Sequence, residues 1–216
     1  MPGTSYGLPA RACITGAKLA KVPLTACSVC YALSDRYASR NAAEAQRRRL
    51  ASLSHPRWVE AMTLLLLHVH RVPRFKVDAG VKNAKRRGLQ RWQWNEAGFH
   101  RWHDSGDLQS TEHFGMICEV ARRTPRIRHW LPTQELGMVK CYLAGGGAVP
   151  ANLAVRVSSV MIDDAARRAW PLTSSVVAAR TPDNAHICPA PTQDHRCGAC
   201  RACWSREVPH VAYELH

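Results

Sequence analysis

The sequence predicts an α/β fold, either a partial barrel or an open, mostly parallel sheet with crossover helices, and two observations lead to it. Strand-like and helix-like segments alternate between residues 99 and 178, and this alternation is typical of parallel sheets. Cysteine-rich segments that resemble loops flank that region at both ends. We therefore predict a single domain, with an N-terminal cysteine-containing loop at 1–34, an α/β core at 35–180 and a cysteine-rich C-terminal extension at 181–216.

Two helices are expected before the alternating region. Asp35 can cap the first, which runs to about Leu53 and is rich in Ala, Arg and Glu. Ser54-His55-Pro56 opens the second, because proline suits a first helical turn, and this helix ends near residues 71–73.

The core elements follow in chain order from their apolar patterns and capping residues. Residues 99–103 alternate and are aromatic, as in a strand, and Ser110 then caps a helix to about Arg123. A glycine triplet at 145–147 is expected to interrupt the regular secondary structure. The other expected elements are a strand at 126–132, a helix at 134–143, and strands at 153–157 and 174–178.

The charge is strongly positive, at +14 from 30 Lys and Arg against 16 Asp and Glu. Arginine matches phosphate geometry, so DNA or RNA is one expected partner, bound in a salt-dependent manner. The alternative is a solvated basic face with no partner, and no helix-turn-helix, finger or RNA-recognition signature is present. The basic clusters are Arg47–Arg49, Lys82–Arg87, Arg122–Arg123, Arg126 with Arg128, and Arg167–Arg168.

The location expected from the sequence is the cytoplasm, without membrane association. The longest apolar stretch, Leu64 to Leu67, is far too short to span a bilayer. The start Met-Pro-Gly-Thr lacks the basic and apolar regions of a signal peptide. Cytoplasmic thiols stay reduced, and the count of nine cysteines is odd, so a disulfide framework is disfavoured.

Four cysteines near the C-terminus have the spacing of metal ligands: Cys188-Pro189, then Cys197-x2-Cys200-x2-Cys203. Two intervening residues let neighbouring thiolates face one centre. The run matches the one that wraps a [4Fe-4S] cluster, with a Cys-Pro pair as the fourth ligand, although here that pair lies upstream. Structural zinc is the alternative, since Cys-x2-Cys pairs also build tetrahedral zinc sites.

A second cysteine group lies near the N-terminus, where Cys27-x2-Cys30 is joined by Cys13 as the expected third ligand. The two groups can form two sites, or Cys27 and Cys30 can join part of the C-terminal group in one. Cys118 and Cys141 fall in expected helices and are interpreted as small core residues.

The turn after the first core strand, His103-Asp104-Ser105-Gly106-Asp107, is the candidate catalytic segment. In parallel sheets, ligands bind beyond the carboxyl ends of the strands, and His103, Asp104 and Asp107 fall there. The competing interpretation is that the two carboxylates only cap the turn and the next helix.

These motifs together resemble a phage-associated family of cysteine-rich proteins, the one named after phage gene product eighty-eight. The matching pieces are Cys27-x2-Cys30-Tyr31-Ala32, the strand and turn from His103 to Ser110, and the ending from Cys188 to Trp204. They occur in the family's order and span nearly the whole chain. The resemblance implies a phage or prophage origin, in a bacterial host, and no particular activity.

A more distant likeness is to radical-SAM enzymes, in which three early cysteines hold a cubane cluster and S-adenosylmethionine (SAM) binds its open iron. Some of these enzymes carry an auxiliary cluster in a cysteine-rich C-terminal extension. The layout here is similar, but thirteen residues separate Cys13 from Cys27, where that family has three.

Three functions are compatible with the sequence. One is an iron–sulfur enzyme with one or two [4Fe-4S] clusters, acting on nucleic acid or nucleotides, with SAM as a candidate cofactor. Another is a nucleic-acid-binding protein in which metal only fixes the chain ends. The third is a zinc protein that binds a host protein and catalyses nothing.

Overall fold

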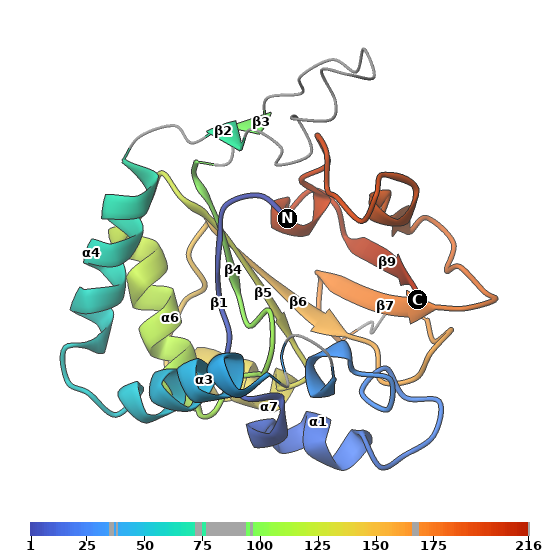
Figure 1. The fold of residues 1–216 in the computed structure, drawn as a ribbon, viewed down its shortest axis with the longest axis horizontal. Helices are drawn as coiled ribbons and strands as arrows, with labels where there is room; N and C mark the ends of the chain where they lie inside the picture. The colour runs from blue at the N-terminus through green and yellow to red at the C-terminus, as the bar shows by residue number, and fades with distance from the viewer. Residues whose placement is uncertain are drawn as a thin grey trace.

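The computed structural model describes residues 1–34, 37, 39–71, 75–76, 94–95, 97–165 and 169–215. Its centre is an open, entirely parallel seven-stranded sheet in the order β1-β4-β5-β6-β7-β9-β8 (Figure 1). The predicted α/β class is therefore confirmed in its open-sheet form, because the sheet does not close into a barrel. The strands are β1 (Thr4–Tyr6), β4 (Phe99–Trp102), β5 (Arg128–Thr133), β6 (Leu153–Ser158), β7 (Thr173–Val177), β8 (His186–Ile187) and β9 (His210–Glu214).

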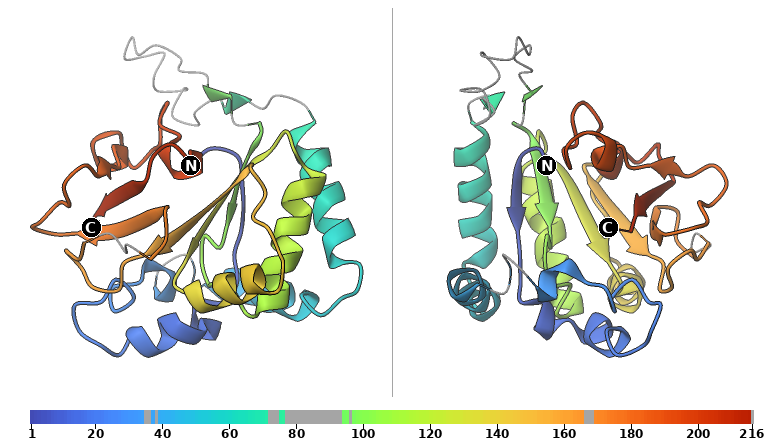
Figure 2. Two further views of the ribbon diagram at one scale, coloured as in Figure 1. Left: turned by 180° about the vertical axis from the view of Figure 1, so that it is seen from behind. Right: turned by 45° about the vertical axis from the view of Figure 1, so that its right-hand side comes forward.

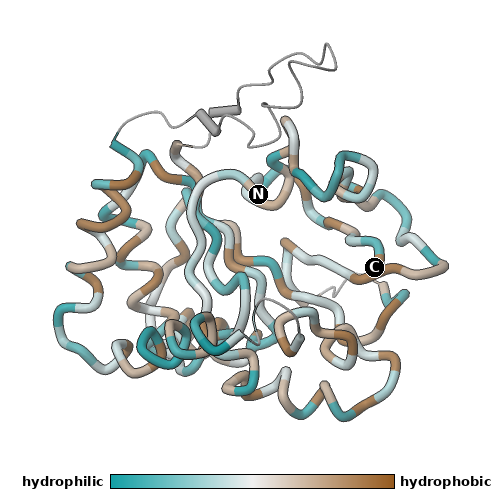
Figure 3. The backbone as a smooth tube through the Cα atoms, viewed as in Figure 1, coloured by the Kyte–Doolittle hydropathy of each residue, from teal (hydrophilic) through white to brown (hydrophobic). Residues whose placement is uncertain are grey.

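Helices cover one face of this sheet, and the C-terminal segment covers the other (Figure 2). The longer helices are α3 (Arg40–Ser52), α4 (Trp58–His70), α6 (Thr111–Arg123) and α7 (Leu136–Ala144). The larger apolar core lies between α4, α6 and the sheet, and a smaller one lies beneath residues 202–204 on the opposite face. Figure 3 shows apolar stretches along α4 and the central strands. β2 (Phe75–Lys76) pairs with β3 (Trp94–Asn95) in a separate two-stranded antiparallel sheet.

The capping residues explain where the helices start. Ser110 accepts a hydrogen bond from the backbone N–H of His113 at 3.1 Å, which fixes the first turn of α6 as predicted. Ser39 does the same for α3 through Ala42 N–H, at 3.4 Å. The helix expected from residue 35 thus begins at Arg40, and Asp35 itself lies outside the described residues.

The two flanking segments are more ordered than the sequence indicates. The expected N-terminal loop contains β1 and the short helix α1 (Ile14–Leu19), and the C-terminal extension supplies β8 and β9. Both segments therefore belong to the same sheet as the core, and their cysteines are positioned by it. Among the described helices, none combines the length and apolar character needed to cross a membrane.

Candidate functional site

Cys13, Cys27 and Cys30 converge near the edge of the sheet where the parallel strands end. Cys13 immediately precedes α1, and Gly16 lies one turn further on. A Cβ atom on Gly16 would lie 3.6 Å from the sulfurs of both Cys13 and Cys27, so the two thiols face the same space. Burial raises the pKa of Cys13 to about 12 and that of Cys27 to about 11, and the nearby Cys30 reinforces both shifts. Burial and their mutual proximity therefore favour the protonated form of these thiols.

Glu135, two residues after the end of β5, anchors the helix that follows Cys13. Its carboxylate accepts hydrogen bonds from the backbone N–H of Thr15 at 2.7 Å and from the Thr15 hydroxyl at 2.8 Å. Because Thr15 is in the first turn of α1, Glu135 satisfies a free helix N–H and fixes Cys13 against the sheet. Sequence reasoning missed this residue, although the rule that singled out the turn after β4 also applies to the end of β5.

Asp107 is buried and satisfied by three donors at the same edge. Its oxygens accept from Leu108 N–H at 2.7 Å, from the Thr133 hydroxyl at 2.6 Å and from Gln134 N–H at 2.8 Å. Burial raises its pKa to about 7, against the opposing effect of these three bonds. The carboxylate ties the turn after β4 to the end of β5, and its charge raises the pKa of Cys13. Asp107 therefore combines a structural role with a position beside the N-terminal thiols.

His103 and Asp104 point to different surroundings from Asp107. Asp104 accepts from the Ser5 hydroxyl at 2.8 Å and, weakly, from Tyr37 at 3.5 Å, near the surface. His103 adopts a left-handed backbone, with φ of 56°, and is buried beside His113 with ring centroids 5.3 Å apart. Burial lowers its pKa well below the usual range, and within the described structure neither ring nitrogen has a hydrogen-bond partner. The predicted turn is thus divided between the edge and the interior, and its catalytic role stays a prediction.

Cys188, Cys197, Cys200 and Cys203 gather on the face opposite the helices. Burial raises the pKa of Cys188, and the charges of Cys197 and Cys200 add to that shift. Burial also raises the pKa of Cys203 to about 12, with a contribution from Cys188. The thiols have two polar neighbours that sequence reasoning missed. The Tyr213 hydroxyl lies 3.1 Å from the Cys203 sulfur, and His186 Nε2 lies 3.3 Å from the Cys200 sulfur.

Arg156, in the middle of β6, holds the loop that carries Cys203. Its side chain is fully buried and donates to the carbonyl oxygens of Ala202, Cys203, Ser205 and Val208 at 2.7–3.0 Å. Weaker bonds reach the carbonyls of residues 173 and 209. The sequence offers one indication of this role, because a charged residue inside the apolar run Leu-Ala-Val-Arg-Val is rarely buried without hydrogen-bond partners.

No cysteine is paired in a disulfide in this structure. All nine cysteines are free, including Cys141, which is exposed and so corrects its interpretation as a core residue, whereas Cys118 is buried as expected. Across the described residues, no three His, Cys, Asp or Glu side chains already surround one ion position.

The arginine clusters that the structure describes are partly engaged with acidic residues. Glu44 pairs with Arg47 at 2.7 Å, and Glu119 pairs with Arg122 at 3.0 Å and Arg123 at 2.7 Å. These are solvent-exposed pairs within single helices, which leave the arginines accessible. Lys82–Arg87 and Arg167–Arg168 lie outside the described residues.

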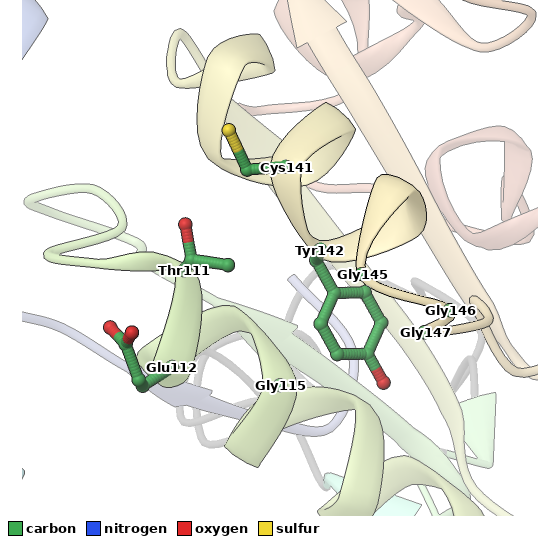
Figure 4. A pocket seen from close by; sticks show the side chains of 8 residues that line it. All are labelled: Thr111, Glu112, Gly115, Cys141, Tyr142, Gly145, Gly146 and Gly147. Atoms are coloured by element: carbon green, nitrogen blue, oxygen red, sulfur yellow. The ribbon is translucent and has the colours of Figure 1, made fainter.

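Two surface hollows lie near these elements. The larger, of about 470 Å³, separates α6 from α7 beside Tyr142 and the glycines at 145–147, and none of the seven grouped cysteines lines it (Figure 4). The smaller, of about 320 Å³, lies between α3 and the N-terminal cysteine segment. Arg11, Tyr37, Gln46 and Arg47 give it polar groups, and Ala32 lies two residues beyond Cys30.

A family model described as Gene product 88 matches residues 1–206, which is nearly the whole chain. No curated protein and no solved structure matches the chain. The family match bears out the resemblance drawn from the cysteine motifs and the turn at His103 to Asp107, and nothing in the comparisons supports the radical-SAM likeness.

Proposed function

This chain belongs to the gene product 88 family of phage proteins, and we propose that it is an iron–sulfur protein with two cluster sites. Cys188, Cys197, Cys200 and Cys203 would hold a [4Fe-4S] cluster with a complete set of thiolates. Cys13, Cys27 and Cys30 would hold a second cluster through three thiolates. The observation that carries the proposal is that the fold gathers seven cysteines from the two chain ends into two sets of free, partly buried thiols.

The N-terminal site is the candidate reaction site. Three thiolates leave one corner of a cubane without a protein ligand, and such a corner supplies a Lewis-acidic iron for a substrate or for SAM. Around it, Glu135 fixes the backbone of α1, and Asp107 is positioned to exchange a proton because its raised pKa lies near neutrality. The hollow lined by Arg11 and Arg47 is open to an anionic ligand.

The substrate class that we propose is nucleic acid or a nucleotide. The net charge of +14 supports a polyanion, and two arginines are exposed nearby on the surface, Arg126 between α6 and β5 and Arg128 at the start of β5. The second candidate is a nucleic-acid-binding or host-protein-binding module with structural zinc, favoured by the contact of His186 with Cys200, because zinc accepts mixed His and Cys ligands. Both candidates place the protein in the cytoplasm of a bacterial host.

Purification under anaerobic conditions tests the proposal. The expected product is a brown protein with equal amounts of iron and acid-labile sulfide. Cys27→Ser with Cys30→Ser, and Cys197→Ser with Cys200→Ser, should each remove about half of the iron, whereas Cys141→Ser should remove none. A colourless protein that retains stoichiometric zinc would replace the cluster with the zinc alternative, and cysteines paired in disulfides would exclude both.

A further inference from the structure

The outward side of α4 carries leucines at positions where a surface helix usually carries polar residues. Leu64 and Leu65 are each 59% exposed, and Leu67 is 41% exposed. Packing against the rest of the molecule uses the other side of the helix, where Met62 and Leu66 are buried in the larger core. α4 lies at the outer edge of the molecule in Figures 1 and 2, so this apolar side faces away from the sheet. Contiguous apolar residues on an exposed side are typical of an interaction surface.

Four exposed residues form one line along this side of the helix. We call them the α4 stripe: Glu60, Leu64, Leu67 and Arg71. They are separated by four, three and four residues, the spacing that keeps side chains on one side of a helix over successive turns. Reading the stripe in reverse gives the same separations, with the acidic and basic ends exchanged. The stripe is therefore complementary to a second copy of itself.

A two-fold axis through the midpoint of the stripe places α4 antiparallel to α4 of a partner subunit. In a contact of this symmetry, every pair of residues occurs twice with the roles reversed. Leu64 then faces Leu67 of the partner subunit, and Glu60 faces Arg71 of the partner subunit. A parallel arrangement would place each of these two charged residues against its own copy, so the charges favour the antiparallel orientation.

The two charged ends of the stripe are accessible for this contact. Arg57, one turn before Glu60, donates to its carboxylate from Nε at 2.7 Å and from NH2 at 2.9 Å, and both side chains are exposed. An exposed pair of this kind adds little stability, and a carboxylate can accept hydrogen bonds from two guanidinium groups. Arg71 is exposed at the C-terminal end of α4 and forms no ion pair within the described structure.

We propose that this chain forms a two-fold symmetric homodimer through the α4 stripe. The helix has 13 residues and is therefore about 20 Å long, so the contact is at the small end of specific interfaces and the dimer dissociates readily on dilution. The leucine pairs supply most of the affinity, and the charge pairs set the orientation. The contact lies on the helix-covered face and does not depend on metal.

Sedimentation velocity and light scattering over protein concentrations from about 10 µM to 1 mM test the proposal. The mass should rise from the 24.0 kDa of one chain to twice that value as the concentration increases. Leu64→Lys should keep the protein monomeric over this range, because it places a charge in the centre of the contact. Leu143→Lys is the matched control, since Leu143 is an exposed leucine on α7 outside the stripe, and it should dimerise like the wild type. Both substitutions are at exposed positions, and circular dichroism checks that the fold is retained.

Exchange of the charges tests the antiparallel orientation. Glu60→Arg alone and Arg71→Glu alone should each weaken self-association by at least about tenfold, because like charges then face each other twice. An equimolar mixture of these two variants should associate again, since each charge of one variant meets its opposite on the other. A monomer at every concentration, a dimer that survives Leu64→Lys, or a mixture that does not associate would each overturn the proposal.

Discussion

Replacement of Arg156 by Met should destabilise the protein and release the loop that carries Cys203. Methionine has nearly the same length but donates no hydrogen bond, so the carbonyls of residues 202, 203, 205 and 208 lose bonds of 2.7–3.0 Å. Each stranded buried carbonyl costs on the order of 1 kcal/mol, and bonds from a charged donor are worth roughly 1.5–3 kcal/mol. Relief of the buried charge offsets part of this loss, because burying a guanidinium is itself expensive.

We therefore expect Arg156→Met to lower the unfolding free energy by about 3–5 kcal/mol. For a chain of this size, that corresponds to a melting temperature lower by on the order of 10 °C. Tryptophan fluorescence during urea and thermal unfolding measures it, since Trp204 lies in the released loop against Trp130. Arg156→Lys keeps the charge but offers fewer donors, so it should lie between wild type and Met. Hydrogen exchange at residues 202–209 should accelerate in both variants.

An unchanged midpoint in Arg156→Met would refute the reasoning, because it would mean that the loop carbonyls do not depend on the guanidinium. Iron content gives a second readout. The variant should lose iron from the C-terminal group while the N-terminal group keeps its share, and equal loss from both would indicate general unfolding instead.

Three further predictions concern the carboxyl edge of the sheet. Gly16→Ala places a Cβ 3.1 Å from the Cys13 Cβ and should lower the amount of iron bound by the N-terminal cysteines. Gly137→Ala is the control, because the space around Gly137 is open; it should keep the iron and add up to about 1 kcal/mol to the unfolding free energy. Equal iron content in both variants would contradict this prediction. Asp107→Asn should cost about 1–3 kcal/mol of unfolding free energy. The pKa of Asp107 is raised from 3.8 to about 7, so the folded metal-free protein keeps this proton to higher pH than the unfolded chain does. The unfolding free energy of the wild type should therefore fall as the pH rises between these two values. The Asn variant should lose this pH dependence. Glu135→Gln should weaken one of the two bonds to Thr15 and cost about 1 kcal/mol, seen as faster amide exchange in α1; unchanged exchange would argue against the anchor.

The central part of the fold follows from the sequence because its signals are local. The alternation before Trp102, the cap at Ser110 and the glycine triplet at 145–147 each act within a few residues, and the corresponding strand and helix boundaries agree to within about two residues. The strands at the two chain ends were missed for the opposite reason. β1 has only three residues and no apolar run, and it exists because it pairs with β4 across almost one hundred positions of sequence.

The candidate site divides in the same way. Spacing alone groups Cys197, Cys200 and Cys203, since their separations are set by one turn of backbone. The partners of these cysteines come from distant strands: Tyr213 on β9, and Arg156 on β6. No spacing rule connects such residues, because they are brought together only by the order of strands in the sheet. The sequence alone shows that an arginine inside an apolar strand is unusual, but it does not show which carbonyl groups accept its hydrogen bonds.

The position of β9 between β7 and β8 determines when the C-terminal site can form. β8 pairs only with β9 in the described sheet, and Cys188 donates its backbone N–H to Ala212 of β9 at 2.8 Å. Residues 186–204 therefore leave the ribosome before the strand that seats them exists. Until residues 210–214 are added, four reactive thiols remain together on an undocked segment, exposed to oxidation and to adventitious metals. Seating of residues 186–204 on the sheet therefore depends on β9, and without that strand β7 would be left with an open edge and the four cysteines with no platform.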